Sequence, residues 1–259
     1  MTRIDPPLPP ARSDGSPALQ VEDLVYRYRG RPILDGVGFE VAAGECVGLA
    51  GINGAGKTTL LRCLLDFARP ERGTIRLFGI DSRRPEARAR IGFLPERFAP
   101  PAALTGHEVL QWLAGLHGSG WSRDDSARAF ERFEIAADAL RRPVGQFSKG
   151  MTQKLGLAAV LSSGRSLVIL DEPMSGLDPI ARRFVARALS QARSAGTTLL
   201  FTSHSPADIE RLCDRLLVMH QGRQCFAGAP DQLRAARPAQ DLEQAFVDLI
   251  GAQPTGVPT

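Results

Sequence analysis

The chain has 259 residues, 43% of them hydrophobic and 23% charged, which is enough for one large domain or for a domain with a sub-domain. The net charge is only +4 and the arginines are scattered, so nucleic-acid binding is not indicated and we expect no nucleic-acid partner. No apolar run approaches the ~18 residues of a membrane helix, and prolines near the start leave no room for a signal-peptide core, which predicts a cytoplasmic protein.

The cysteines form no C-x-x-C pair and lie inside apolar segments, at Cys46, Cys63, Cys213 and Cys225. We interpret them as small buried hydrophobic side chains in a reducing compartment, not as metal ligands or disulfides. Three histidines lie in helix or hairpin contexts and are interpreted as surface residues or as residues with satisfied hydrogen bonds: His107, His117 and His220.

The N-terminal part of the chain predicts a tail followed by short strands. The tail, residues 1–17, is rich in proline and polar side chains and is expected to be disordered. The pattern then predicts strands over 18–28 and 33–41 with a turn at 30–32 between them. A hairpin at 42–44 is expected to lead into a buried strand that ends at Ala50.

A glycine-rich loop follows that strand, and a helix with apolar residues at helical spacing follows the loop. The loop fits the pattern G-x-x-x-x-G-K-[ST], and it has the strand and helix context that this pattern needs. We expect Lys57 to reach the β- and γ-phosphates of a nucleotide and the Thr58 hydroxyl to hold Mg²⁺. The phosphates are expected to lie in a cradle of backbone N–H groups made by Gly51, Ile52, Asn53, Gly54, Ala55, Gly56, Lys57, Thr58 and Thr59.

The middle of the chain changes in character. Strands are expected over 73–79 and 91–94, with an arginine-rich polar stretch between them. Residues 98–161 carry no strand signal, and we interpret them as a helical sub-domain inserted into an α/β body. The first helix is expected to begin at a T-x-x-E capping box at 105 and to end at about 116, and a second helix is expected to start at 122. A third, short helix should end at about 140, and a fourth should run from 147 to 161.

The α/β pattern returns at 167–170, where four consecutive apolar residues fit a strand covered on both faces. Asp178-Pro179 and Ser205-Pro206 each predict a helix start, with an N-cap residue followed by proline at the first helical position. A parallel strand over 198–202, a hairpin over 216–226 and a helix over 241–250 complete the chain. We therefore expect a folded domain over 18–230, and a C-terminal helix with a loose tail over 231–259.

Asp171 and Glu172 end the apolar strand, and with the phosphate loop upstream they match a Walker B strand. We expect Asp171 to bind Mg²⁺ through water, opposite Thr58, and Glu172 to orient and deprotonate an attacking water. The alternative interpretation is a carboxylate pair that merely caps the following helix.

From Ala18 to Gly228 the chain resembles the ATP-binding subunit of an ABC transporter, whose motifs occur here in the order of the family. The resemblance implies a P-loop NTPase core, a mostly parallel sheet with helices on both faces, joined by an N-terminal antiparallel β sub-domain and an all-helical signature sub-domain. It implies ATP and Mg²⁺ as cofactors, a dimer with a second ATP-binding subunit, and an integral membrane permease that holds the protein at the inner face of the cell membrane.

The same resemblance gives roles to residues outside the two motifs above. Tyr28 lies where the family stacks an aromatic ring on adenine. Ser148 and Gly150, at the start of a long helix, match the part of the signature that faces the γ-phosphate on the partner subunit. Asp178 lies at the same interface and is also an N-cap, while His204 matches the switch histidine that holds the attacking water in line.

Three positions depart from the pattern of the family. Glu96 replaces the usual glutamine; it can still bind the metal through water, but it adds negative charge close to the phosphates. Lys149 replaces the first signature glycine, and Met151 replaces the closing glutamine. Residues 94–96 together with 147–151 are similar to the branch that pairs with ABC-2-type export permeases.

We therefore expect an ATP-hydrolysing subunit that binds MgATP at a dimer interface and drives transport, in the export direction, through a separate permease. The loop from Glu96 to about Thr105, with the helices after it, is expected to contact that permease. One alternative is a soluble ABC ATPase acting in translation or DNA repair, and another is a nucleotide-binding regulatory subunit without activity. Ordinary GTPases are disfavoured, because the chain has no N-K-x-D motif.

Overall fold

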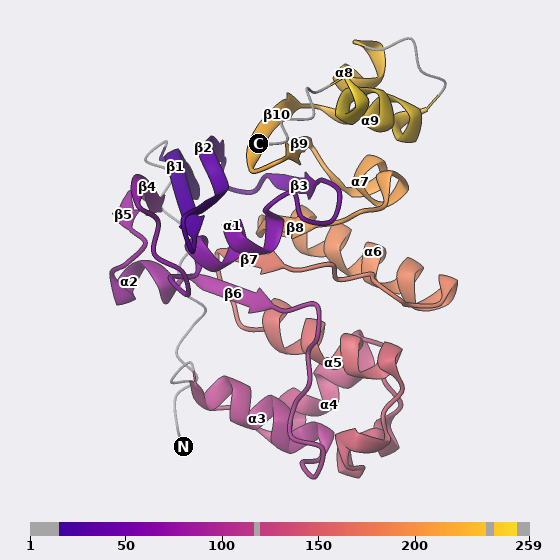
Figure 1. Ribbon diagram of the computed structural model, residues 1–259. Helices are drawn as coiled ribbons and strands as arrows, with labels where there is room; N and C mark the ends of the chain where they lie inside the picture. Colours follow the sequence, from indigo (N-terminus) through magenta and orange to yellow (C-terminus); the bar gives the residue numbers. More distant parts are fainter. Residues whose placement is uncertain (1–15, 117–119, 237–240, 253–259) are drawn as a thin grey trace.

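The computed structural model describes residues 16–116, 120–236 and 241–252, so most of the predicted N-terminal tail, the loose C-terminal residues and His117 lie outside the described residues. An antiparallel sheet and a mostly parallel sheet are surrounded by helices, which confirms the predicted α/β class. Figure 1 shows the antiparallel sheet at the left, a helical lobe below, and the C-terminal helices α8 (Pro230–Ala235) and α9 (Leu242–Gly251) at the upper right.

The antiparallel sheet has the strand order β2-β1-β4-β5. Its strands are β1 (Leu19–Tyr28), β2 (Arg31–Val41), β4 (Arg72–Leu77) and β5 (Ile80–Asp81). The turn between β1 and β2 lies at Arg29 and Gly30, one residue earlier than predicted. Both residues have positive φ angles, 50° and 80°, as a tight two-residue hairpin turn requires, and Arg31 and Pro32 are therefore paired within β2.

The second sheet has the strand order β10-β9-β3-β8-β7-β6. Its strands are β3 (Cys46–Ala50), β6 (Ile91–Leu94), β7 (Leu167–Leu170), β8 (Thr198–Thr202), β9 (Arg215–His220) and β10 (Arg223–Gly228). All neighbours are parallel except β9 and β10, which form the predicted hairpin. Because β8 lies between β3 and β7, the loops after these three strands meet at one edge of the sheet.

The remaining helices are α1 (Lys57–Leu64), α2 (Pro85–Arg88), α3 (Gly106–Leu116), α4 (Arg123–Arg132), α5 (Lys149–Leu161), α6 (Pro179–Ser194) and α7 (Pro206–Leu212). The short elements α2, α8 and β5 were not predicted, and the helix expected near 140 is a 3₁₀ turn over Ala137–Arg141. Within the described residues, no helix is both long and apolar enough to cross a bilayer.

Side-chain caps explain where several of these helices begin. The backbone N–H of Thr105 donates to Glu108 at 2.7 Å, which confirms the predicted capping box before α3. Ser122 and Asp125 form the same motif at α4. Ser205 does precede α7, but its side chain accepts no cap hydrogen bond, so its predicted capping role is wrong. There the hydroxyl of Ser203 accepts the N–H of Ser205 instead.

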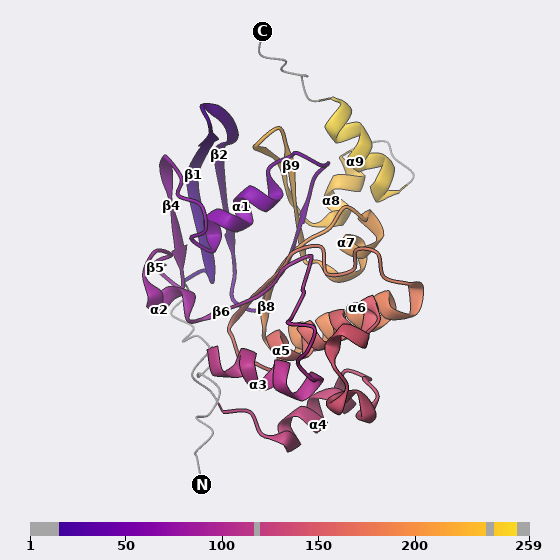
Figure 2. The ribbon, with the colours of Figure 1, turned by 60° about the horizontal axis from the view of Figure 1, so that its bottom comes forward.

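The parallel sheet is covered on both faces. In β7, Leu167 and Ile169 pack into a core shared with α1 and the antiparallel sheet. Val168 and Leu170 point to the other face, into a core formed with helices α3 to α6. Figure 2 shows α1 on one side of the sheet and α5 and α6 on the other. This two-sided burial is the reason that the strand has four consecutive apolar residues.

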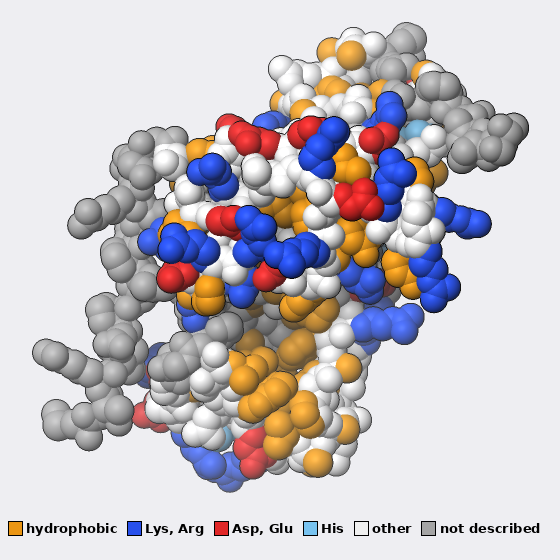
Figure 3. Space-filling model, turned by 60° about the vertical axis from the view of Figure 1, so that its left-hand side comes forward, with side chains coloured by type: hydrophobic (Ala, Val, Ile, Leu, Met, Phe, Trp, Pro, Cys, Tyr) orange, Lys and Arg blue, Asp and Glu red, His pale blue; other side chains and the backbone are white. Residues whose placement is uncertain are grey.

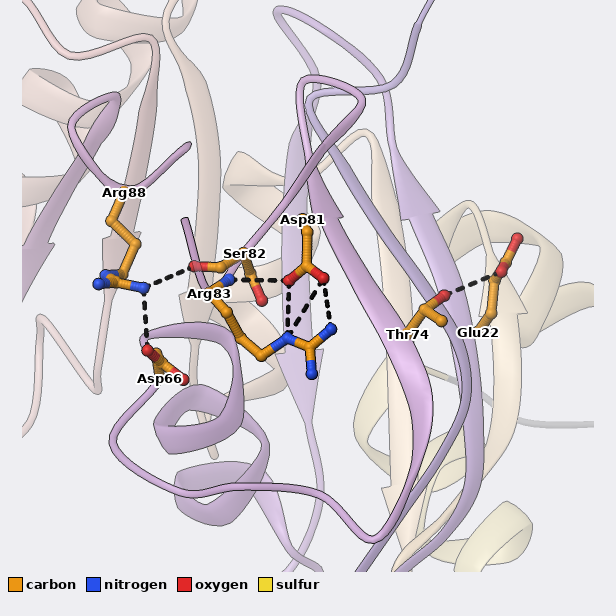
Figure 4. A network of polar contacts seen from close by, with 7 residues as sticks. All are labelled: Glu22, Asp66, Thr74, Asp81, Ser82, Arg83 and Arg88. Atoms are coloured by element: carbon orange, nitrogen blue, oxygen red, sulfur yellow. Dashed lines mark hydrogen bonds and ion pairs between the residues drawn. The ribbon is translucent and has the colours of Figure 1, made fainter. Parts of the chain in front are cut away.

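Polar contacts join the antiparallel sheet to the end of α1 (Figure 4). Arg88, from α2, donates to Asp66 and to the carbonyl of Ser82, both at 2.9 Å. Beside them the Arg83 guanidinium hydrogen-bonds to the Asp81 carboxylate and lowers the pKa of that group to about 2. Asp66, two residues after the end of α1, and the segment after β4 are therefore held together through the Arg88 side chain.

Candidate functional site

The loop from Gly51 to Gly56 connects β3 to α1, in the strand–loop–helix order that the sequence predicts. Gly54 and Gly56 have φ angles of 83° and 104°, in the left-handed region that favours glycine. A Cβ atom on Gly56 would lie 2.9 Å from Leu34 Cδ2 and 3.0 Å from the carbonyl oxygen of Ile33. Only glycine therefore fits at the last position before α1, where the first N–H groups of the helix are without intrahelical partners.

Lys57 begins α1 and is buried, with 9% of its surface exposed. Its ammonium group donates to the carbonyl of Gly51 at 2.6 Å and to that of Ile52 at 3.4 Å. Burial lowers the pKa of Lys57, and the nearby carboxylates of Glu172 and Asp171 act in the opposite direction. The ammonium group thus lies over its own loop, in the electrostatic field of the two carboxylates that follow β7.

Asp171 and Glu172 follow β7 directly, and Thr202 at the end of β8 contacts both. The Thr202 hydroxyl donates to Asp171 Oδ1 at 2.7 Å, and the backbone N–H of Glu172 donates to the same hydroxyl oxygen at 2.7 Å. Burial raises the pKa of Asp171, and the hydrogen bond from Thr202 opposes this effect. Sequence reasoning missed Thr202; the only signal was its position directly before Ser203-His204.

His204, in the loop after β8, lies beside Glu172. Its Nδ1 atom is 2.8 Å from Glu172 Oε2. The Glu172 side chain is 15% exposed and that of His204 is 63% exposed, so the pair lies at the surface with the carboxylate on the inner side. Glu172 has a φ angle of 46°, a left-handed conformation that is unusual for a residue with a side chain.

Two predicted interface residues cap helices. The Ser148 hydroxyl accepts the N–H of Met151 at 3.2 Å at the start of α5. The Asp178 carboxylate accepts the N–H groups of Ile180 and Ala181, both at 2.9 Å, at the start of α6. The N-cap role of Asp178 is confirmed. A hydroxyl can donate while it accepts, so capping leaves Ser148 able to donate to a phosphate oxygen.

The start of α5 packs against the loop that follows Glu172. A Cβ atom on Gly176 would lie 2.3 Å from Lys149 Nζ, which places the lysine that replaces a signature glycine over this loop. The buried side chain of Gln153 donates to the carbonyl of Pro173 at 2.8 Å. A Cβ atom on Gly150 would lie 3.5 Å from Ala181 Cβ, so the starts of α5 and α6 are neighbours.

Tyr28 and Glu96 are both exposed. Tyr28 ends β1 with 57% of its surface exposed, and the Arg29 guanidinium lies 5.5 Å from the centre of its ring. The ring is therefore accessible for stacking. Glu96 follows β6 and lies close enough to Asp171 to contribute to the raised pKa of that group.

No group of three or more His, Cys, Asp or Glu side chains within the described residues is arranged to hold a metal ion. Mg²⁺ that arrives with a nucleotide does not need such a group, because one or two carboxylates and the phosphates usually hold it. Two neighbouring carboxylates, those of Asp171 and Glu96, can supply oxygen ligands to such an ion, and so can the hydroxyl of the exposed residue Thr58. The residues present therefore fit a nucleotide-bound Mg²⁺.

The interpretation of the histidines and cysteines needs one correction. His107 is satisfied, because its Nδ1 atom is 2.7 Å from the Ser126 hydroxyl. His220 is 9% exposed, and neither of its ring nitrogens has a hydrogen-bond partner within the described structure, so it is neither a surface residue nor a satisfied one. Of the four cysteines, Cys46 and Cys63 are buried, as predicted, whereas Cys213 and Cys225 are half-buried.

Comparison with known proteins agrees with this geometry. The sequence profile of the family described as ABC transporter matches residues 34–175. The Nod factor export ATP-binding protein I of Paraburkholderia xenovorans is 39% identical over 238 residues, covering 88% of this chain and 76% of that protein. The protein of the same name from Ralstonia nicotianae is 37% identical over 251 residues, covering 94% and 77%.

A solved structure described as the ATP binding subunit of an ABC transporter superposes with a TM-score of 0.80 at 32% identity, covering 90% of this chain and 99% of the other. These relatives favour the transport interpretation over a role in translation or DNA repair, and over a subunit without activity. The chain belongs to the family of ABC transporter ATP-binding subunits, which are ATPases.

Proposed function

We propose that two copies of this protein close around two MgATP molecules and that hydrolysis drives export through a separate membrane permease. The observation that carries this proposal is the 2.8 Å contact between Glu172 and His204, at the sheet edge where the phosphate loop also lies. A carboxylate paired with an imidazole at this place has the geometry needed to hold a water molecule for attack on a phosphate.

In this proposal the phosphates lie on the N–H groups of residues 51–59, and the adenine ring stacks on Tyr28. Lys57 leaves the carbonyl groups of its own loop and donates to the β- and γ-phosphates. Thr58, Asp171 and Glu96 would hold Mg²⁺, which would supply positive charge against the phosphates.

The chemical step uses the pair described above. Glu172 accepts a proton from water as the water oxygen bonds to the γ-phosphorus, and the bond from that phosphorus to the β-γ bridging oxygen breaks to release ADP. His204 orients Glu172 and donates toward the γ-phosphate. Ser148 and Gly150 of the partner copy complete the site, because the start of α5 stabilises an anion, and Asp178 lies near the same interface.

An apolar hollow of about 430 Å³ supports a docking place for the permease. It lies between the loop after β6 and helices α3, α4 and α5, and its lining includes Phe98, Leu113 and Trp121. Figure 3 shows hydrophobic side chains gathered over the lower lobe, the part that contains α3 in Figure 1. We propose that a helix of an export permease fills this hollow and holds the protein at the inner face of the membrane.

Replacement of Glu172 by Gln tests the chemistry. This change keeps the size of the side chain and removes the proton acceptor, so ATP binding should persist while turnover falls by about 10²–10³-fold. Glu131→Gln, an exposed position on α4, is the matched control and should hydrolyse ATP at the parental rate. Parental turnover in Glu172→Gln would exclude Glu172 as the base.

Replacement of Leu113 by Arg tests the docking place. An arginine in the apolar hollow should remove co-purification with the permease from detergent-solubilised membranes, while ATP binding stays parental. Gln111→Arg, an exposed position on the same helix, is the control and should keep the complex. An intact complex with Leu113→Arg would place the permease elsewhere.

A further inference from the structure

A single buried hydroxyl connects the two carboxylate residues of the candidate site. Thr202 ends β8 and has no exposed surface. Its Oγ1 atom is 2.7 Å from Asp171 Oδ1 and 2.7 Å from the backbone nitrogen of Glu172. Both contacts cross from β8 to the end of β7, some thirty residues away in the sequence.

The direction of both hydrogen bonds is fixed by chemistry. A backbone N–H can only donate, so the Thr202 oxygen accepts from Glu172. The one proton of the hydroxyl is then left for Asp171, whose ionised carboxylate can only accept. A hydroxyl is the smallest group that satisfies both neighbours at once, and valine, with the same shape, satisfies neither.

Each of the two bonds constrains something that the proposed reaction uses. The bond to Oδ1 restrains rotation of the Asp171 carboxylate, which has only partial contact with solvent. The bond from Glu172 restrains the backbone of a residue whose φ angle is 46°, in a region that normally costs free energy. That backbone directs the Glu172 side chain toward His204.

We propose that Thr202 is a positioning residue that orients Asp171 toward Mg²⁺ and Glu172 toward His204 through one shared hydroxyl. The inference rests on the proposed function, because it takes Asp171 as the metal-binding carboxylate and Glu172 as the base. It predicts that the loss of one oxygen atom, outside any contact with the nucleotide, weakens Mg²⁺ binding and lowers the rate of hydrolysis together. Partners of metal ligands typically affect metal affinity or activity by about 10–100-fold.

The test compares Thr202→Val with Thr198→Val in the full chain. Thr198 lies at the other end of β8, is 2% exposed, and accepts the N–H of Gly44 at 2.9 Å, so its valine variant also loses a buried hydroxyl. Binding of a fluorescent ATP analogue is measured against Mg²⁺ concentration, together with turnover and thermal unfolding. Thr202→Val should raise the Mg²⁺ midpoint about tenfold or more and lower turnover at saturating Mg²⁺ by a similar factor.

Thr202→Ser keeps the hydroxyl and should return both values close to parental. Thr198→Val should lower the unfolding temperature and leave the Mg²⁺ midpoint unchanged. If Thr202→Val is too unstable to purify, Thr202→Cys keeps the size, weakens both hydrogen bonds and should move the midpoint in the same direction. A parental midpoint and parental turnover in a folded Thr202→Val or Thr202→Cys protein would overturn the inference.

Asp171→Asn separates this inference from the function on which it rests. If Asp171→Asn abolishes the Mg²⁺ dependence of binding and Thr202→Val does not change it, Asp171 is the metal ligand and Thr202 has only a structural role. If neither variant changes the Mg²⁺ dependence, the assignment of the metal site itself is wrong.

Discussion

Gly56 offers a quantitative test of how tightly the phosphate loop is held against β2. A Cβ atom at this position would meet Leu34 Cδ2 at 2.9 Å and the Ile33 carbonyl oxygen at 3.0 Å, and the φ angle is 104°. Gly196, which follows α6, has a φ angle of 88° but no atom within 4 Å of the same Cβ position. The two glycines therefore share the backbone strain of a left-handed residue and differ in the steric overlap.

Alanine at either position should cost about 1–2 kcal/mol from the left-handed conformation alone. At Gly56 the overlap with a strand backbone should add about 1–3 kcal/mol, the usual cost of overpacking. For a chain of this size, the additional cost of the overlap at Gly56 corresponds to a fall of about 2–12 °C in the unfolding temperature. Gly56→Ala should also weaken ATP binding, because the N–H groups of the loop must shift.

Thermal unfolding followed by circular dichroism, with binding of a fluorescent ATP analogue, measures both effects. Gly196→Ala should show the smaller loss of stability and parental nucleotide affinity. Equal unfolding temperatures for the two variants would refute the reasoning, because they would mean that β2 yields to the added methyl group without cost.

Two further predictions concern stability. The Arg83–Asp81 pair lowers the pKa of Asp81 from 3.8 to about 2, so its stabilisation is present above pH 3.8 and is lost as the pH falls through about 2. Arg83→Gln should lower the unfolding temperature only slightly at pH 7, because both side chains of this pair are largely exposed to solvent. The difference from the parent should shrink below pH 4 and in 1 M salt, and a difference that is independent of pH and salt would contradict this cause. Asp178→Ala should cost about 0.5–2 kcal/mol in urea unfolding through the lost N-cap, whereas Asp178→Asn should restore most of it, and equal losses in both variants would argue against capping.

The features that the sequence predicts well are local ones. The phosphate loop, the apolar strand before Asp171 and the Asp178-Pro179 helix start each depend on residues within one turn or one strand. The β1–β2 turn shows the limit of this approach, because Arg29 takes a left-handed conformation that glycine or asparagine would have signalled more clearly. The turn therefore lies one residue away from its predicted place.

Contacts between segments distant in the chain are not visible in such patterns. Thr202 reaches Asp171 because β7 and β8 are adjacent in the sheet, and sheet order is a property of the whole fold. The bond from Gln153 to Pro173 and the approach of Lys149 to Gly176 likewise depend on how α5 packs against the loop after β7. Sequence spacing gives no information on these distances.

The central claim is that each ATP lies between the phosphate loop of one copy and Ser148 of the other. The most direct measurement mixes two inactive variants, Lys57→Ala and Ser148→Arg, under conditions in which subunits exchange, and records Mg²⁺-dependent ATP hydrolysis. A mixed dimer would then contain one doubly altered site and one intact site, so an equal mixture should regain up to about a quarter of the parental activity. Activity that stays at the level of the separate variants would contradict the shared site, and full parental activity of Ser148→Arg alone would exclude Ser148 from it.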